Sequence, residues 1–179
     1  SGNELGCLLL HYILSCKKAL GTLNPNSAAV KSIVTTEQAR GICASFGVAL
    51  YDVLTGFKFI AEKIEGFEKT GEHTFVFGFE ESCGYLSGTR VRDKDGVNAC
   101  LLIAEAALYY RERGMTLFDA VEAIGAEYGY YADEVIAVTL PGLDGLDKMK
   151  AITAALRKNP PASIGDRKVL EARDYLNGF

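Results

Sequence analysis

Residues 75–95 decide the fold of this chain and carry most of its candidate chemistry. The stretch begins Phe-Val-Phe-Gly-Phe at residues 75–79, an apolar run typical of a buried strand. It continues with Glu80, Glu81 and Ser82, a glycine turn and a segment rich in charged residues. Open α/β sheets bind ligands beyond the carboxyl ends of their strands. We therefore expect function where this strand ends.

Predicted strands and helices alternate on both sides of this stretch. Strand composition predicts strands at residues 28–34, 48–53 and 75–79. Apolar periodicity predicts helices at about residues 5–20, 36–46, 57–64, 96–113 and 116–126. The expected helix caps are Thr35 or Thr36, Asp95, and Thr116 with Asp119. Alternation of this kind indicates an α/β layered domain.

The pattern changes after about residue 133. A strand-like run at residues 130–140 precedes a helix at 142–158, which ends at Asn-Pro-Pro, and a strand-like piece at 168–172. About 45 residues cannot bury a core of their own without disulfides or metals. We expect residues 134–179 to be a linker and the incomplete start of a second domain, loosely held after about residue 140.

Composition and charge exclude several classes of protein. The formal net charge of -4 gives no electrostatic case for nucleic acid or an acidic membrane as partner. No apolar run approaches the roughly 20 residues that cross a bilayer, and no leader peptide is recognisable. The five cysteines lack metal-ligand spacing, so we interpret them as reduced thiols of a cytoplasmic protein.

The two carboxylates after the strand are the first candidates for binding. Side chains alternate along an extended chain, so Glu80 and Ser82 are expected on one face and Glu81 on the other. A carboxylate beside a hydroxyl suits the neighbouring hydroxyl groups of a sugar, because ionised carboxylates accept strong hydrogen bonds. The alternative is a pair of solvated loop carboxylates.

Two lysines are further candidates. Lys58 stands at a predicted helix start, where the helix dipole disfavours the ammonium form and could promote proton exchange with a hydroxyl group. Its alternative is a solvated helix lysine. Lys31 lies in an otherwise apolar strand, either at an edge position or as a phosphate or substrate contact. The segment 93–96 lacks the distal glutamate of a calcium loop, so we predict no metal site.

Four motifs in register resemble one known family. They are residues 2–10 (Gly-Asn-Glu-Leu-Gly-Cys-Leu-Leu-Leu), 55–60 (Thr-Gly-Phe-Lys-Phe-Ile), 78–85 (Gly-Phe-Glu-Glu-Ser-Cys-Gly-Tyr) and 93–97 (Asp-Lys-Asp-Gly-Val). Together, residues 1–133 resemble the third domain of the phosphoglucomutase/phosphomannomutase family. Within that family, the motifs most resemble those of a bacterial phosphoglucomutase. The tail resembles the start of the fourth domain. The resemblance implies an α/β domain with a small mixed sheet packed between helices, followed by a truncated α+β piece.

The resemblance also implies the activity of a larger parent enzyme. Members of the family interconvert hexose 1-phosphate and hexose 6-phosphate through a bisphosphorylated sugar. Their first domain carries a phosphoserine, the second a magnesium loop, the third a sugar-specificity loop and the fourth a phosphate loop. This sequence contains motifs of the third element only. We therefore expect a piece of a larger enzyme, inactive alone, whose Mg²⁺ and hexose bisphosphate activator are not bound here.

The family's site residues are carried over by position. Glu80 and Ser82 match sugar-loop positions that contact ring hydroxyls, and Lys58 matches a position assigned to proton transfer. Phe57 stands where other members have histidine, and Cys83-Gly84 where many have Gly-His. The remaining substrate-binding candidates are Lys31, Thr55, Gly56, Gly78 and Glu81.

The expected partners are a hexose phosphate, such as glucose 1-phosphate or glucose 6-phosphate, and the missing domains of the same chain. Two alternatives stay open. The first is a related mutase, namely a phosphomannomutase, a phosphoglucosamine mutase or a phosphopentomutase. The second is a stand-alone α/β sugar-binding module.

Overall fold

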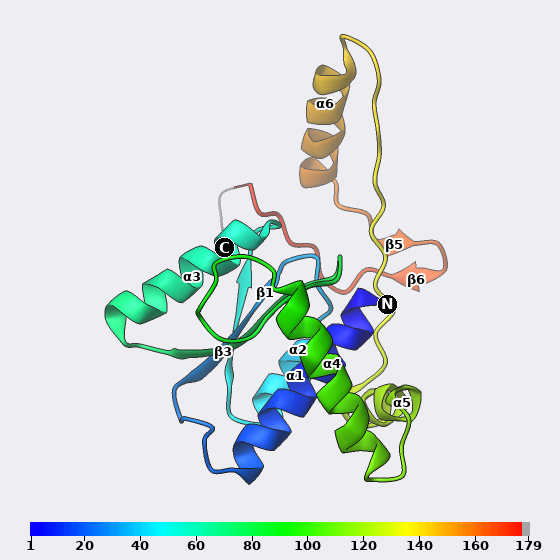
Figure 1. Cartoon of the computed structure of the whole chain (residues 1–179). Helices are drawn as coiled ribbons and strands as arrows, with labels where there is room; N and C mark the ends of the chain where they lie inside the picture. Colours follow the sequence, from blue (N-terminus) through cyan, green and yellow to red (C-terminus); the bar gives the residue numbers. More distant parts are fainter. Residues whose placement is uncertain (177–179) are drawn as a thin grey trace. The chain divides into compact units, whose positions relative to one another are not determined.

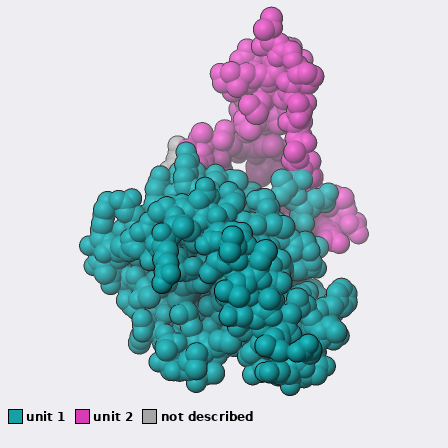
Figure 2. Space-filling view, in the orientation of Figure 1, with its two compact units in different colours: residues 1–135 teal, residues 136–179 magenta. Residues whose placement is uncertain are grey.

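A computed structural model describes residues 1–176 of the chain. The chain divides into two compact units, residues 1–135 and residues 136–179, drawn in different colours in Figure 2. Each unit is considered by itself. Within the described residues, no helix combines the length and the apolar composition needed to cross a membrane.

The first unit is built on a four-stranded mixed sheet with the strand order β2-β1-β3-β4. Strands β1, β2 and β3 are parallel, and β4 pairs antiparallel with β3. In chain order its elements are α1 (Gly2–Ala19), β1 (Ser27–Ser32), α2 (Gln38–Ser45), β2 (Ala49–Val53), α3 (Phe57–Thr70), β3 (Thr74–Glu80), β4 (Gly84–Leu86), α4 (Gly96–Arg111) and α5 (Leu117–Tyr128). The predicted α/β layered domain with a small mixed sheet between helices is confirmed.

Helices cover both faces of the sheet, and each face has its own apolar core. Helices α1, α2, α4 and α5 pack on the face that carries Phe77 and Phe79, whereas α3 packs on the opposite face (Figure 1). There Ile60 and Ile64 of α3 meet Phe75 of β3. Because both faces of β1 and β3 are covered, nearly all of their residues are buried, and neither strand alternates between apolar and polar residues.

Helix α1 approaches the sheet unusually closely through two glycines. A Cβ atom at Gly6 would lie 2.2 Å from the ring of Phe79, and one at Gly2 would lie 1.9 Å from the carbonyl oxygen of Glu81. Any side chain at these positions would push the helix away from the carboxyl end of β3. The glycines of the first motif therefore bring the start of α1 against the end of β3.

Most predicted helix caps are present, and one differs. Asp95 accepts a hydrogen bond from the Asn98 amide, and Thr116 forms a capping box with Asp119. Helix α2 begins at Gln38, two residues later than the expected start at residue 36, with Glu37 at the N-cap. The Thr36 hydroxyl accepts a bond from the Gln38 amide at 3.3 Å instead.

Several sequence-based boundaries are wrong. Helix α3 extends to Thr70, not 64, and ends at Gly71, which adopts the left-handed conformation that glycine tolerates best. Strand β4 was not expected, because a three-residue strand has too little pattern to recognise. The predicted strand at residues 130–140 is absent: the segment contains no strand, and its apolar side chains Val135, Ile136 and Val138 are exposed.

The second unit contains helix α6 (Gly145–Lys158) and a two-stranded hairpin. The hairpin consists of β5 (Ser163–Ile164) and β6 (Arg167–Lys168), so the strand expected at residues 168–172 is wrong. The largest apolar side chains of the second unit are exposed, among them Leu146, Met149 and Leu156 on α6. The assignment of this unit to the start of a fourth domain, and its loose packing, stay predictions.

Candidate functional site

The carboxyl ends of the three parallel strands meet at one edge of the sheet. Because β1 lies between β2 and β3, the segments after Ser32, Val53 and Glu80 are neighbours there. The amide of Ile33 donates to the carbonyl of Val53 at 2.8 Å, which ties two of these segments together. Helices α2 and α3 leave β1 and β2 toward opposite faces, so this edge includes the switch point between β1 and β3 where open sheets bind ligands.

Glu80 ends β3 with a buried carboxylate, only 4% exposed. Its Oε1 accepts a hydrogen bond of 2.8 Å from the amide of Gly56. Gly56 has φ 124°, a conformation that residues with a Cβ rarely adopt, and it is the N-cap of α3. The glycine thus aims its N–H at Glu80, and the helix N-terminus favours the negative charge.

The second oxygen of Glu80 faces Lys94. The Lys94 ammonium lies 3.7 Å from Glu80 Oε2, which makes an ion pair but is too long for a hydrogen bond. The Lys94 side chain runs over Gly84, where a Cβ would lie only 3.0 Å from its Cε atom. Oε2 therefore retains the capacity to accept a hydrogen bond from a ligand hydroxyl.

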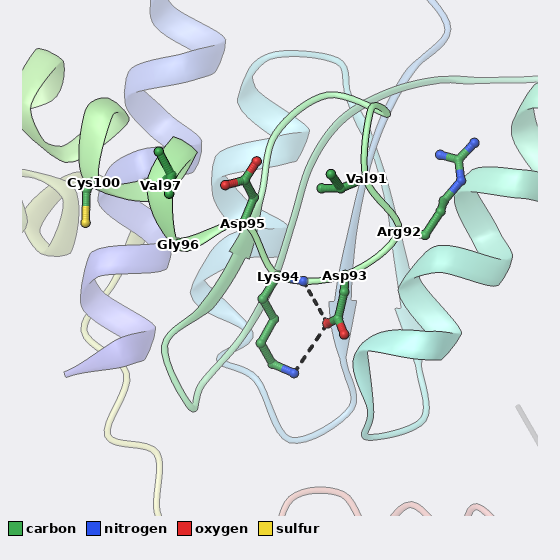
Figure 3. Close-up of a pocket in the computed structure, with 8 residues that line it drawn as sticks. All are labelled: Val91, Arg92, Asp93, Lys94, Asp95, Gly96, Val97 and Cys100. Carbon is green, nitrogen blue, oxygen red and sulfur yellow. Dashed lines mark hydrogen bonds and ion pairs between the residues drawn. The ribbon is translucent and has the colours of Figure 1, made fainter.

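Lys94 also borders a pocket lined by residues 91–97 and Cys100. Figure 3 shows these side chains around the loop that enters α4. The ammonium group of Lys94 lies 3.7 Å from Asp93 Oδ1 and 5.2 Å from the centre of the Phe57 ring. The pocket is open to solvent at exposed residues such as Arg92 and Val97. A ligand at Glu80 would therefore have the positive charge of Lys94 close by.

Ser82 does not share a strand face with Glu80, which corrects the prediction. The chain turns at residues 81–83, and Ser82 lies exposed at the tip. Cys83 completes the turn with φ 62°, as in three-residue hairpins whose last residue is left-handed. The argument from an extended chain fails because β3 ends at Glu80.

The carboxylate of Glu81 is hydrogen-bonded to residues at and just after the end of β1. Its Oε2 accepts hydrogen bonds from Ser32 Oγ at 3.2 Å and Thr35 Oγ1 at 3.3 Å. The two hydroxyl oxygens are themselves 2.7 Å apart. Ser32 and Thr35 are both buried. This Ser32–Thr35–Glu81 cluster therefore links the end of β1 and the loop after it to the turn that follows β3.

Lys31 is completely buried, which excludes the predicted edge position because β1 is a central strand. Its ammonium contacts Asp52 Oδ1 at 2.9 Å, Glu37 Oε1 at 3.0 Å and the Thr35 carbonyl oxygen at 3.0 Å. Arg40 bridges the same two carboxylates. A direct substrate contact by Lys31 stays a prediction, and it requires the groups that cover the ammonium to move.

The charges around Lys31 compensate one another. Burial alone would raise the pKa of Glu37, but hydrogen bonds from Arg40 and Lys31 outweigh it and lower the pKa to about 2. Glu37 therefore stays ionised throughout the neutral range. The result is a network of two cations and two anions across β1, β2 and the start of α2.

The other predicted site residues lie in three different environments. Lys58 is exposed in the first turn of α3, with its ammonium 4.8 Å from the centre of the Phe59 ring. Thr55 is exposed just before that helix. Gly78 is buried: a Cβ there would lie 2.9 Å from Ile60 Cγ2, so the structure gives Gly78 a packing role against α3 instead of a place on the surface of the site.

Sequence reasoning missed three residues of this edge. Lys94 stood within one of the quoted motifs but was not singled out, although a glycine such as Gly84 leaves room for a long side chain. Ser32 and Thr35 gave no signal, because nothing local in the sequence pairs them with Glu81, which is 46 or more residues away.

Comparisons with known proteins point to one family. The family model described as phosphoglucomutase/phosphomannomutase, alpha/beta/alpha domain III, matches residues 1–128. Two proteins named phosphoglucomutase, from two strains of Staphylococcus aureus, are 38% and 37% identical to this chain over 176 residues. The match covers 98% of this chain and 31% of each relative, so the chain spans less than a third of their length.

Solved structures show the same fold. A protein described as a phosphomannomutase from Thermus thermophilus aligns with a TM-score of 0.54 at 20% identity, over 71% of this chain and 25% of its own. Parafusin, a phosphoglucomutase from Paramecium, aligns with a TM-score of 0.51 at 21% identity, over 72% of this chain and 21% of its own. At these identities the likeness concerns the fold alone.

Proposed function

Because the chain belongs to the phosphoglucomutase/phosphomannomutase family, we propose that it is the sugar-binding domain of an enzyme that interconverts hexose 1-phosphate and hexose 6-phosphate. The observation that carries this proposal is the geometry of Glu80. Its carboxylate is fixed by Gly56 through one oxygen and keeps the other oxygen available for a sugar hydroxyl. A site that reads hydroxyl groups instead of phosphates can hold a bisphosphorylated sugar in either orientation, which two successive phosphoryl transfers require.

The surrounding residues have separate tasks in this proposal. Lys94 supplies positive charge beside Glu80 and close to where an anionic sugar would lie. Ser82, at the tip of the turn, adds a hydroxyl group that can accept or donate a hydrogen bond. Lys58 exchanges a proton with the reacting hydroxyl from the first turn of α3. Phosphoryl transfer depends mainly on positioning and on charge stabilisation, which such groups provide.

The proposal assigns magnesium no ligands among the described residues. Among residues 1–176, no group of three or more His, Cys, Asp and Glu side chains could hold a metal ion. We place the metal, the phosphoserine and the phosphate-binding loop in other parts of a longer, cytoplasmic protein. The chain alone would bind sugar weakly and would not catalyse the reaction.

The proposal is tested by amide NMR titration of the chain with glucose 1-phosphate. We expect shifts confined to residues 55–58, 78–86 and 94, with a dissociation constant on the order of millimolar. Glu80→Gln keeps the shape and the acceptor for the Gly56 amide but removes the charge, and it should weaken binding at least about fivefold. Glu65→Gln, an exposed glutamate on α3, is the matched control and should bind as the wild type does.

The same titration separates the alternatives. Shifts with glucose 1-phosphate that exceed those with mannose, glucosamine or pentose phosphates identify the preferred sugar. Shifts outside this edge of the sheet, or shifts that Glu80→Gln leaves unchanged, would contradict the site. Equal shifts with unphosphorylated glucose would show that the phosphate of glucose 1-phosphate, and Lys94 as the charge beside it, contribute nothing to binding.

A further inference from the structure

We propose that the Ser32–Thr35–Glu81 cluster positions the sugar-binding turn, so that Glu81 acts as a positioning residue and not as a sugar ligand. This inference rests on the proposed function, because it concerns how the same site is held. Glu81 is the first residue of the turn at residues 81–83, directly after Glu80 and directly before Ser82. Whatever fixes its side chain also fixes where the turn leaves the sheet.

The hydrogen atoms available to the cluster limit how it is bonded. Ser32 and Thr35 have one hydroxyl hydrogen each, but three close contacts join the two hydroxyls and Glu81 Oε2. One hydroxyl therefore donates to the other, which donates to the carboxylate. Either hydroxyl alone can still donate to Glu81, so the cluster fails only when both are removed.

The neighbouring elements hold both ends of this cluster. On one side, the Lys31 ammonium binds the carbonyl oxygen of Thr35 at 3.0 Å and so fixes the backbone of the donor. On the other side, helix α1 packs Gly2 directly on the carbonyl oxygen of Glu81. Tyr85, after the turn, donates its hydroxyl to the Gly2 carbonyl oxygen at 2.9 Å. The turn is thus held from β1 and from α1, while Ser82 and Cys83 remain exposed.

The energetic reason for this arrangement is preorganisation. A turn without these contacts would lose conformational freedom on binding sugar, and that cost would reduce affinity. Hydrogen bonds to a carboxylate are stronger than those between neutral groups, which favours one conformation of a short turn. Because buried donors occupy Oε2 of Glu81, this oxygen is not available to a ligand.

The test uses the chain with both donors removed, Ser32→Ala with Thr35→Val. Amide ¹⁵N relaxation reports order at residues 81–84, and titration with glucose 1-phosphate reports affinity. We expect order parameters near 0.85 in the wild type and below about 0.6 in the double variant. Affinity should fall at least about fivefold, while each single variant should lose less than half as much.

Two controls separate positioning from a general loss of stability. Thr36→Val removes the neighbouring buried hydroxyl, which bonds to the Gln38 amide and not to Glu81, and it should leave both readouts unchanged. Ser32→Ala with Thr35→Ser restores one donor and should recover order and affinity. Urea unfolding of all variants confirms that they are folded.

Three results would overturn the inference: unchanged order parameters in the double variant, equal effects of Thr36→Val, or a looser turn that binds glucose 1-phosphate with wild-type affinity. The proposed function fails separately. If the wild type binds no hexose phosphate, the proposed function is refuted. The cluster then has no role in sugar binding, even if the relaxation data show that it anchors the turn.

Discussion

The ammonium nitrogen of Lys94 lies 3.7 Å from Oε2 of Glu80, across a surface left open by Gly84. The two residues differ sharply in exposure: the lysine side chain is 48% exposed, and the glutamate side chain only 5%. The buried carboxylate of Glu80 accepts its hydrogen bond from the Gly56 amide, and Lys94 adds a longer, half-exposed ion pair at the other oxygen. Because Lys94 reaches solvent, it can also move toward an anionic ligand.

Lys94→Ala should weaken binding of glucose 1-phosphate by about three- to tenfold, because the charge beside Glu80 is lost. Stability should change by no more than about 0.5 kcal/mol, since half-exposed ion pairs contribute little. NMR titration and urea unfolding measure the two effects. Lys94→Arg should retain most of the affinity, and Lys69→Ala, on exposed α3 surface, all of it. Equal losses in Lys69→Ala would show that only net charge matters.

Gly6→Ala should destabilise the first unit by about 1–3 kcal/mol, because its methyl group would overlap the Phe79 ring. Gly66→Ala is the matched helical control. A Cβ at Gly66 meets nothing within 4 Å, so alanine there should stabilise the protein by up to about 1 kcal/mol through helix propensity. Urea unfolding compares the two variants. Loss of stability in both would argue against close packing as the cause.

Lys31→Met should cost about 3 kcal/mol, because removing one partner leaves Glu37 and Asp52 with Arg40 as their shared cation. Arg40 limits the damage by still pairing with both carboxylates. The matched control is Lys69→Met, which removes an exposed pair on α3 and should change stability by less than about 0.5 kcal/mol. Similar urea-unfolding midpoints for the two variants would contradict a stabilising role of the buried charge network.

The protein should lose stability as the pH falls below about 6.5, partly through His11. Burial lowers the pKa of His11 in the folded state, against an opposing effect of Glu127. The unfolded chain, with a histidine pKa near 6.5, therefore takes up a proton first, which favours unfolding at acid pH. The contribution of His11 to stability is complete above the histidine pKa of the unfolded chain, and it declines as the pH falls below that pKa.

Urea midpoints measured between pH 5 and 8 test this expectation. His11→Gln removes the titrating group beside Tyr110 and should flatten the curve relative to the wild type. His73→Gln, on the opposite face of the sheet beside Tyr51, should keep the contribution of His11. Parallel curves for the wild type and His11→Gln would assign the acid sensitivity to other groups.

Sequence alone predicted the parts of the fold that depend on local pattern. Long helices such as α1 and α4, and apolar strands such as β3, carry enough periodicity to be recognised. The strand expected at residues 130–140 failed because apolar β-branched residues predict a strand only where a partner strand exists. None pairs with that segment within the part of the chain that the structure describes.

The site was predicted less completely, for a physical reason. Glu80 was identified from its place at the end of a strand, but its partners come from α3 and from the loop before α4. The roles of Glu81 and Lys31 depend on contacts between β1 and its neighbours, and the alternation of side chains does not report them. Contacts that join distant segments are decided by packing, and the sequence shows them only when a motif is already known.

Strand β4 has a consequence for how this protein behaves at high concentration. It forms one edge of the sheet, yet it is only three residues long, and the carbonyl of its central residue Tyr85 is already bonded to the Asp95 amide. A long unpaired edge is a template on which other chains add strands and aggregate. Here the returning loop occupies part of that template, which disfavours intermolecular strand addition at the edge next to the turn at residues 81–83.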